Sequence, residues 1–393
     1  MFAQDNLTFV RKQKFSIHRA SSAITIFNNA HAFVRDSISF HNPISPELAN
    51  KKYPTCISEQ DKLNILNYKE IYYLHNNSNT NEIIEDNGYI FFNFNKANHI
   101  VFRYEQIELC GRGSFGTVLK CFDHKEKTYV AIKIIANSEE YNSLAEREVR
   151  FLETLSTNKE TQSETHIIEL IDTFSDSKFT YIVTKFYKQN LYDYIKSKFV
   201  AGIPFRDIRH IAKSVAKAMQ LIHSCGIIHS DLKPENIMLE GTNPYIIDFG
   251  CSSFDDECTS DTVQGLYYRA PEVIFNNGYN SSIDVWSFGC LLFELITGTP
   301  LFESKNETDL IRQITKVLGD PSQELINSSK KMKRYWFRKQ IHVDNDESQK
   351  NSFLGEFLGN TNTEIISVIS ACLKWDPNER PTFNELLEYP FFN

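Results

Sequence analysis

Five short segments follow one another in a fixed order along the chain, and each carries glycine or charged residues beside an apolar run. They read GRGSFG (residues 111–116), VAIK (130–133), HSDLKPEN (229–236), DFG (248–250) and APE (270–272). Each segment alone could be an ordinary turn or the end of a strand. Their joint occurrence in this order is hard to explain by five accidents, so we interpret them as parts of one site.

The composition is that of a globular protein, with 41% hydrophobic and 23% charged residues among 393. A formal net charge of −8 argues against general nucleic-acid binding, and no apolar run is long enough to span a bilayer. The eight cysteines are scattered without metal-site spacing, which is typical of reduced thiols in the cytoplasm or nucleus. We therefore expect a protein of these compartments without nucleic-acid or membrane partners, and a monomer by default.

The pattern of apolar residues changes from strand-like to helical along the chain. Up to about residue 187, runs such as TYVAIKII and FTYIVTKF are rich in β-branched and aromatic residues, and one segment, SLAEREVRFLETL (143–155), has helical periodicity. Later segments are mainly helical, among them IRHIAKSVAKAMQLIHSCG, which should end at Gly226. The segment IDVWSFGCLLFELITG is apolar nearly all round and predicts a buried helix.

The glycine-rich segment predicts a loop that approaches phosphate groups, because a backbone without Cβ atoms can come close to phosphate oxygens. Dinucleotide-binding folds have similar glycines, but a helix follows them there, whereas the next residues here are strand-like. The predicted nucleotide contacts are Gly111, Arg112, Gly113, Ser114, Phe115 and Gly116, with Val118 over the adenine ring.

The segment VAIK places Ala131 and Lys133 on the same face of a strand. The small Ala131 leaves room for adenine while Lys133 reaches the phosphates. A surface lysine at a strand end would be the simpler interpretation if this motif stood alone. A lysine that holds phosphates needs a carboxylate to fix it, and Glu148 on the predicted helix is the candidate, with Glu146 as the nearby alternative.

The segment HSDLKPEN has residue types and spacing suited to phosphoryl transfer. Asp231 can orient an acceptor hydroxyl and receive its proton, and Lys233 can neutralise the moving phosphoryl group. Asn236 is placed to hold a magnesium ion together with Asp248, which follows the apolar run PYII. Met238 is predicted to lie beneath the adenine.

The segment APE contains Glu272, for which we expect a buried partner. Arg380 in DPNERP is the candidate, because an unpaired glutamate there would be costly. This pair is expected to be structural rather than catalytic.

The segments HSDLKPENIML, IIDFGCSSF and YYRAPEVIF resemble eukaryotic protein kinases of the group that contains the cyclin-dependent and MAP kinases. Within it, the chain most resembles the dual-specificity tyrosine-phosphorylation-regulated (DYRK) kinases, over roughly residues 44–392. The resemblance implies an α+β, bilobal kinase fold with a small β-rich N-lobe containing one main helix and a larger, mostly helical C-lobe. It also implies an N-terminal extension (1–43), an accessory region (44–101), the N-lobe and hinge (102–187), and the C-lobe (188–393) with an insert around 303–350.

The activity implied by this resemblance is serine/threonine phosphorylation of proteins with ATP and Mg²⁺. Mn²⁺ is the alternative metal, and dual specificity, which adds tyrosine as an acceptor, is the alternative specificity. Thr184 and Phe186 would border the adenine pocket at the hinge. Arg269 resembles the arginine that shapes a pocket for proline after the acceptor residue. Protein substrates followed by Pro are therefore expected.

Two departures from the family pattern concern regulation. Where the family has a Tyr-x-Tyr pair, this chain has Ser260-Asp261-Thr262, and Leu266 replaces the arginine that would bind a phosphate. Ser230, which stands where most kinases have arginine, cannot bind a phosphate through a guanidinium either. We expect activity without tyrosine phosphorylation of this segment, and Thr262 remains a candidate phosphorylation site.

The main alternative is a pseudokinase or scaffold that binds nucleotide or partners without transferring phosphate. Absence of Lys133, Asp231, Asn236 or Asp248 would favour it, and all four are present. A small-molecule kinase is weaker still, because such enzymes usually lack the APE segment and the insert.

Overall fold

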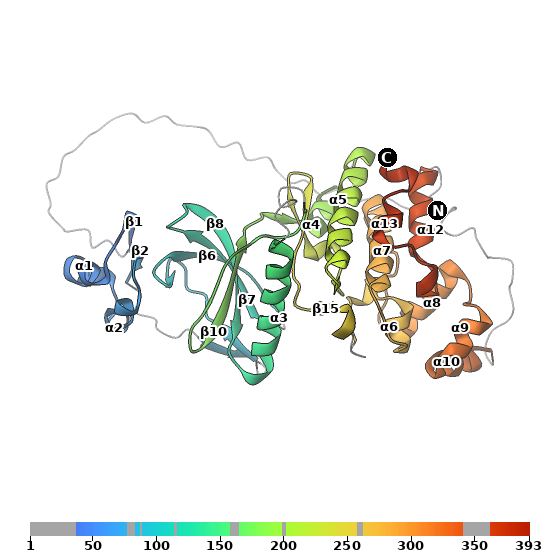
Figure 1. Cartoon of the computed structure of the whole chain (residues 1–393), viewed down its shortest axis with the longest axis horizontal. Coiled ribbons are helices and arrows are strands. Elements are labelled where there is room, and N and C mark those ends of the chain that lie inside the picture. Colours follow the sequence, from blue (N-terminus) through green and yellow to red (C-terminus); the bar gives the residue numbers. More distant parts are fainter. Residues whose placement is uncertain are drawn as a thin grey trace, which may run out of the picture. The chain divides into compact units, whose positions relative to one another are not determined.

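The computed structural model describes residues 37–76, 83–86, 89–113, 116–157, 165–198, 202–257, 262–340 and 362–393 (Figure 1). Residues 1–36 of the predicted extension, and the predicted nucleotide contacts Ser114 and Phe115, lie outside these ranges. The described residues all belong to one compact unit that starts at Asp36. Among them, no helix is both long enough and apolar enough to cross a membrane.

The first described region has a small core of its own. Strand β1 (Ser37–Ile44) pairs antiparallel with β2 (Ile71–His75), and α1 (Pro46–Lys52), α2 (Asp61–Asn64) and the 3-10 turns Pro54–Cys56 and Ile65–Asn67 come between them in the sequence. The buried residues of this core are Phe40, Ala49, Cys56, Ile57, Ile65, Ile71, Leu74 and Phe102. Because β1 begins at Ser37, this folded region starts seven residues before the expected boundary at Ile44.

A six-stranded antiparallel sheet follows, in the order β5-β6-β7-β8-β10-β9. Its strands are β5 (His99–Ile100), β6 (Tyr104–Gly113), β7 (Gly116–Asp123), β8 (Thr128–Ala136), β9 (Leu170–Ser175) and β10 (Phe179–Lys185). The hairpin β3 (Ile83–Asp86) and β4 (Tyr89–Phe92) adds Phe92 to the core on this sheet. Since β5 precedes residue 102, the expected boundary between accessory region and N-lobe cuts through the sheet.

One long helix, α3 (Glu139–Ser156), accompanies the sheet (Figure 1). Its first turn is capped by Ser138, whose hydroxyl accepts the N–H of Tyr141. The predicted helix at 143–155 is confirmed and begins four residues earlier than its periodicity suggested.

The rest of the chain is mainly helical. The helices are α4 (Leu191–Lys198), α5 (Phe205–Ser224), α6 (Pro271–Phe275), α7 (Ser282–Thr297), α8 (Glu307–Leu318), α9 (Gln323–Ser328), α10 (Lys330–Gln340), α12 (Thr363–Cys372) and α13 (Phe383–Leu386). Short 3-10 turns occupy Pro234–Asn236, Asp255–Glu257, Leu266–Tyr268, Pro377–Glu379 and Pro390–Phe392. The α+β, two-lobed fold expected from the sequence is confirmed, and α8 to α10 fall within the predicted insert.

Helix α7 is the centre of this larger part, and it is buried from Ile283 to Leu295, as its apolar sequence predicts. Two small sheets carry the loops of the site. Strand β11 (Gln189–Asn190) joins β13 (Ile237–Glu240) and β14 (Asn243–Ile246), while β12 (Ile227–Ile228) pairs with β15 (Ser253–Phe254). The segment 229–236 therefore leaves β12 and enters β13, and the DFG segment lies between β14 and β15.

Candidate active site

Three charged side chains from distant parts of the chain meet in one cluster. The Nζ atom of Lys133 lies 2.8 and 2.7 Å from the two carboxylate oxygens of Glu148, and 2.9 Å from Oδ1 of Asp248. Glu146, the alternative partner of Lys133, instead lines a surface groove with Asn137 and Arg150. The structure thus joins Lys133 to Glu148.

The local sequence explains this convergence. Along β8 the side chains of Val130, Ile132 and Ile134 are buried in the core of the sheet, so alternation turns Ala131 and Lys133 to the opposite face. Helix α3 then brings Glu148 to Lys133, and the loop after β14 supplies Asp248.

Gly250 lies directly against the charged cluster. A Cβ atom added at this glycine would lie 3.2 Å from Oδ1 of Asp248, 3.4 Å from Nζ of Lys133 and 3.5 Å from Oε2 of Glu148. Contacts of 3.2 Å are tighter than most real Cβ contacts, so a methyl group there would push on the cluster. This close contact is a steric reason for glycine at position 250 of the DFG segment.

The pKa values of the three charged groups are shifted from their ordinary values. Burial alone would lower the pKa of Lys133, but the carboxylates of Glu148 and Asp248 outweigh it and raise that pKa well above its usual range. Lys133 in turn lowers the pKa of Asp248, against the opposing effect of burial. Burial raises the pKa of Glu148, although Lys133 opposes this shift. Lys133 therefore stays charged, and Asp248 stays ionised, at neutral pH.

The cluster lies in a cavity of about 790 Å³. Its lining includes the predicted contacts Gly111, Val118, Ala131, Lys133, Thr184, Phe186 and Met238, together with Glu148 and Asp248. Cys110, Lys120 and Glu235 also line it, and sequence reasoning did not single them out. A volume of this size suits a small-molecule ligand.

Three residues of the predicted glycine-rich set do not line the cavity. Arg112 and Gly113 are exposed at the end of β6. Gly116 has a φ of +132°, and a Cβ atom there would lie 2.3 Å from the carbonyl oxygen of Ile134, so only glycine fits. The role of Gly116 is therefore to let β7 pass close to β8.

The segment 229–236 forms a second polar group beside the cavity. The Oδ2 atom of Asp231 accepts hydrogen bonds from Nζ of Lys233 at 2.6 Å and from Nδ2 of Asn236 at 2.9 Å. Its Oδ1 atom accepts the backbone N–H of Gly265 at 3.0 Å. Asp231 and Lys233 line an adjoining cavity of about 420 Å³ with Thr262 and Arg147. Asp231 is thus held from two sides, next to open space.

Asp284 on α7 anchors this segment, and the sequence analysis did not identify it. Its fully buried carboxylate accepts the backbone N–H groups of His229 and Ser230, both at 2.9 Å, and lies 2.9 Å from Nε2 of His223. Ser230 has a φ of +65°, a conformation that costs non-glycine residues free energy. The sequence held one indication of this role: Asp284 is the single aspartate of an otherwise mainly apolar helix, and a buried carboxylate needs partners.

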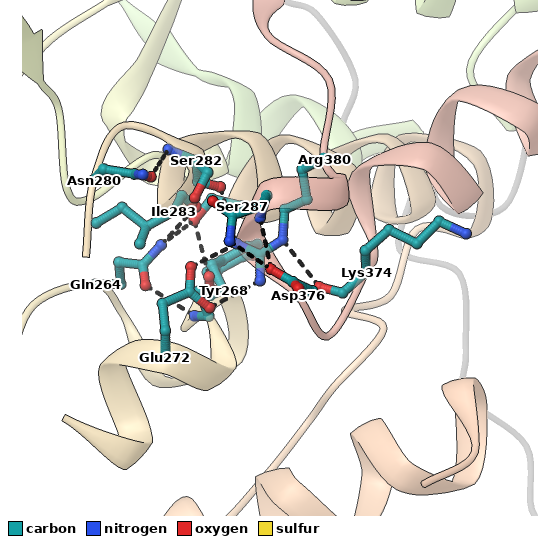
Figure 2. Close-up of polar contacts among 12 residues, drawn as sticks. Gln264, Tyr268, Glu272, Asn280, Ser282, Ile283, Ser287, Lys374, Asp376 and Arg380 are labelled. Atoms are coloured by element: carbon teal, nitrogen blue, oxygen red, sulfur yellow. Dashed lines mark hydrogen bonds and ion pairs between the residues drawn. The ribbon is translucent and has the colours of Figure 1, made fainter. Parts of the chain in front are cut away.

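The segment before α6 is fixed by a buried amide (Figure 2). Nε2 of Gln264 donates to the Ile283 carbonyl at 2.9 Å and to Oγ of Ser287 at 2.8 Å, and its Oε1 accepts the N–H of Ala270 at 2.8 Å. Ser287 donates in turn to the carbonyl of Tyr268 at 2.8 Å. This network holds residues 264–270 against α7.

Glu272 and Arg380 form a buried, bidentate pair, with distances of 2.6 and 2.8 Å (Figure 2). Arg269, by contrast, donates to the carbonyls of Val263 and Gln264 at 3.0 and 2.8 Å and contacts Glu307 at 2.9 Å. Neither Glu272 nor Arg380 reaches the nucleotide-sized cavity, so their contribution is structural.

The donor set suits a divalent cation shared with phosphate groups. The two hydrogen bonds that the Asn236 side chain makes, to Oδ2 and to the backbone carbonyl of Asp231, both use Nδ2, which leaves Oδ1 available. The side chain of Asp248 remains 40% exposed. Within the described residues no group of three or more His, Cys, Asp or Glu side chains could hold a metal alone. Mg²⁺ commonly takes one or two protein oxygens and completes its shell with phosphates and water.

Comparisons with known proteins agree with this geometry. The model of the protein kinase domain matches residues 104–392, which include the charged cluster, the segment 229–236 and the buried pair. The fold and the site therefore define a protein kinase.

Sequence similarity to curated proteins shows which family of protein kinases the chain belongs to. Dual specificity tyrosine-phosphorylation-regulated kinase 3 of Macaca fascicularis is 30% identical over 388 residues, covering 89% of this chain and 68% of the relative. Dual specificity tyrosine-phosphorylation-regulated kinase 2 of Drosophila melanogaster is 33% identical over 373 residues, covering 89% and 51%. A serine/threonine-protein kinase of Schizosaccharomyces pombe is 36% identical over 307 residues, covering 75% and 36%. The chain belongs to the DYRK family of protein serine/threonine kinases.

Proposed function

We propose that this chain transfers the γ-phosphoryl group of ATP to serine and threonine hydroxyls of proteins. The observation that carries this proposal is the convergence of Lys133, Glu148 and Asp248 in a nucleotide-sized cavity, next to Asp231, Lys233 and Asn236. Phosphoryl transfer needs mainly positioning and charge neutralisation, and these groups supply both.

The residues divide the work as follows. Lys133, fixed by Glu148, binds phosphate oxygens, while Val118, Ala131 and Met238 enclose the adenine. Asp231 orients the acceptor hydroxyl and takes its proton, and Lys233 beside it neutralises charge on the moving phosphoryl group. Asp231 can do so because Gly265 and Asn236 fix both of its carboxylate oxygens.

Asp248 and Asn236 would hold the divalent metal that accompanies ATP. Mg²⁺ held by these residues would neutralise negative charge on the phosphate oxygens. The oxygen-only donor set favours Mg²⁺ and also accepts Mn²⁺.

A preference for proline after the acceptor follows from Arg269. Its guanidinium occupies the carbonyls of Val263 and Gln264, next to Gly265 and Asp231. A substrate backbone N–H placed there would lack these acceptors, and proline has no N–H to satisfy. We expect monomeric action in the cytoplasm or nucleus, as the sequence suggests.

Activity without tyrosine phosphorylation is part of the proposal. The hydroxyl of Tyr268 is buried and donates to Glu294 at 2.5 Å, so it is not accessible to a kinase. Leu266 packs on the core and offers no charge for a phosphate. A phosphopeptide map of protein made in a host without other kinases checks this, and stoichiometric phosphorylation of Tyr267 accompanying activity would overturn it.

The activity itself is tested with radiolabelled ATP, Mg²⁺ and a basic acceptor protein, comparing the wild type with Asp231→Asn. We expect label on serine and threonine of the acceptor with the wild type and little with the variant. Equal transfer by both proteins would point to a contaminant. No transfer by the wild type, with ATP still bound, would favour the pseudokinase.

A further inference from the structure

Helix α3 contacts the chain that follows the DFG segment through three residues of one face. Nη2 of Arg147 lies 3.4 Å from the Ser252 carbonyl oxygen and 3.5 Å from Oε2 of Glu257. Nη1 of Arg150 lies 3.8 Å from Oε1 of the same glutamate. Residues 147, 150 and 151 are spaced by three and four, so they share one side of the helix.

An aromatic contact sits beside these charges. The rings of Phe151 and Phe254 are 4.8 Å apart between centroids, and the guanidinium of Arg150 lies 4.6 Å from the centre of the Phe254 ring. Arginine over an aromatic face is attractive. The segment 252–257 therefore meets α3 through a ring contact flanked by two arginines and one carboxylate.

The same segment is tied to the catalytic loop. Phe254 and Ser253 of β15 pair with β12, directly before His229. The hydroxyl of Ser252 donates to the His229 carbonyl at 3.1 Å. Because Glu148 follows Arg147 on α3, whatever fixes Arg147 to this segment also fixes Glu148 relative to the loop that carries Asp231.

We propose that Glu257 is a positioning residue, a permanent negative charge that draws Arg147 and Arg150 of α3 onto the segment 252–257 and so keeps Glu148 at Lys133. The proposal rests on the proposed kinase activity and names how that activity is maintained. Glu257 is the carboxylate that the two arginines share, at 3.5 Å from Nη2 of Arg147 and 3.8 Å from Nη1 of Arg150.

The geometry sets the size of the effect. The side chains of Arg147, Glu257 and Arg150 are 40%, 42% and 64% exposed, and exposed pairs contribute little individually. Two arginines share one carboxylate, so we expect Glu257→Gln to lower kcat/KM about threefold. Glu257→Arg should lower it further, because three cations would then face one another.

The test uses the full chain after phosphatase treatment and measures label transfer at several salt concentrations. Variants are Glu257→Gln, Arg147→Gln and the double variant, with Asp256→Asn as matched control. Asp256 is an exposed carboxylate of the same 3-10 turn, and within the described residues it makes no ion pair.

Under the proposal both single variants are slower, the double variant is no slower than the worse single one, and added salt slows the wild type more than it slows Glu257→Gln. The control behaves as the wild type, and thermal unfolding of all proteins is alike. Glu257→Gln with wild-type kcat/KM, additive effects in the double variant, or loss of wild-type activity after phosphatase treatment would overturn the role of Glu257. Absence of transfer by every protein, untreated wild type included, would instead count against the kinase activity.

Discussion

The carboxylate of Asp284 accepts the backbone N–H of Ser230 at 2.9 Å, deep inside the molecule and one residue before Asp231. Its other oxygen accepts the N–H of His229. The loop that carries the proposed catalytic aspartate thus takes its conformation from α7. Ser230 itself is fully buried, so it does not face a phosphate on the surface.

Asp284→Asn should therefore damage both stability and catalysis. The amide would turn a donor toward N–H groups that now have acceptors, and hydrogen bonds to a charged acceptor are worth about 1.5–3 kcal/mol each. We expect the free energy of unfolding to fall by about 2–3 kcal/mol and kcat to fall with it. Urea unfolding and label transfer measure the two effects.

Ser230→Ala is the control for this prediction. The hydroxyl of Ser230 is buried without a hydrogen-bond partner in the described structure, and alanine keeps the backbone N–H that Asp284 accepts. Stability and activity should stay near those of the wild type. Wild-type stability and activity of Asp284→Asn would contradict the anchoring role of the Asp284 carboxylate. A strong defect in Ser230→Ala would contradict the prediction that the Ser230 hydroxyl has no role.

Gly250→Ala should weaken nucleotide binding without unfolding the protein. The added methyl would press on Oδ1 of Asp248 at 3.2 Å, while Lys133 and Glu148 at 3.4 and 3.5 Å are close to ordinary contact. Small displacements at a reacting centre cost much rate. We expect KM for ATP to rise about three- to tenfold, with KM for the protein acceptor and the melting temperature unchanged. Initial rates over a range of ATP concentrations measure it, and an unchanged KM for ATP would contradict the tight contact.

Glu272→Gln should destabilise the protein through its buried pair. Removing one charge leaves Arg380 unpaired inside, which typically costs about 3–5 kcal/mol. Glu364→Gln is the matched control, because both side chains of its pair with Arg209 are more than a third exposed, and the pair should be worth less than about 1 kcal/mol. Thermal unfolding compares the two, and equal losses would mean that burial of the Glu272 pair does not matter.

Stability should fall as the pH drops below about 6.5, because of His124. Burial lowers the pKa of His124 below its ordinary value of 6.5, outweighing Glu105, which lies 2.9 Å from Nε2. The unfolded chain then binds the proton more readily than the folded one, so protonation favours unfolding.

Urea unfolding between about pH 5 and pH 7 measures this dependence. His124→Gln should flatten it, whereas His210→Gln, at an exposed histidine hydrogen-bonded to Asn243, should not. An unchanged slope in His124→Gln would show that groups other than His124 cause the pH dependence.

The sequence predicted those parts of the site that are local in the chain. Lys133, Asp231, Asn236 and Asp248 each stand in a short motif, and strand alternation or helical periodicity indicated which way Lys133 and Glu148 point. The two-lobed fold followed from the change in periodicity together with the family resemblance.

The parts that could not be predicted depend on contacts between distant segments. Nothing near Glu257 in the sequence indicates Arg147, and the acceptors of the Gln264 amide lie on α7. Strand β1 was missed because SISFHNPI lacks a regular apolar alternation, and its pairing with β2 defines it.

The central claim is that one group of residues holds ATP while Asp231 acts on the acceptor hydroxyl. The most direct test is calorimetric titration of Asp231→Asn with ATP and Mg²⁺, with label transfer measured on the same sample. The account predicts wild-type affinity for ATP and transfer slower by about 100-fold or more. Transfer at the wild-type rate, or a wild type that binds no ATP, would contradict it.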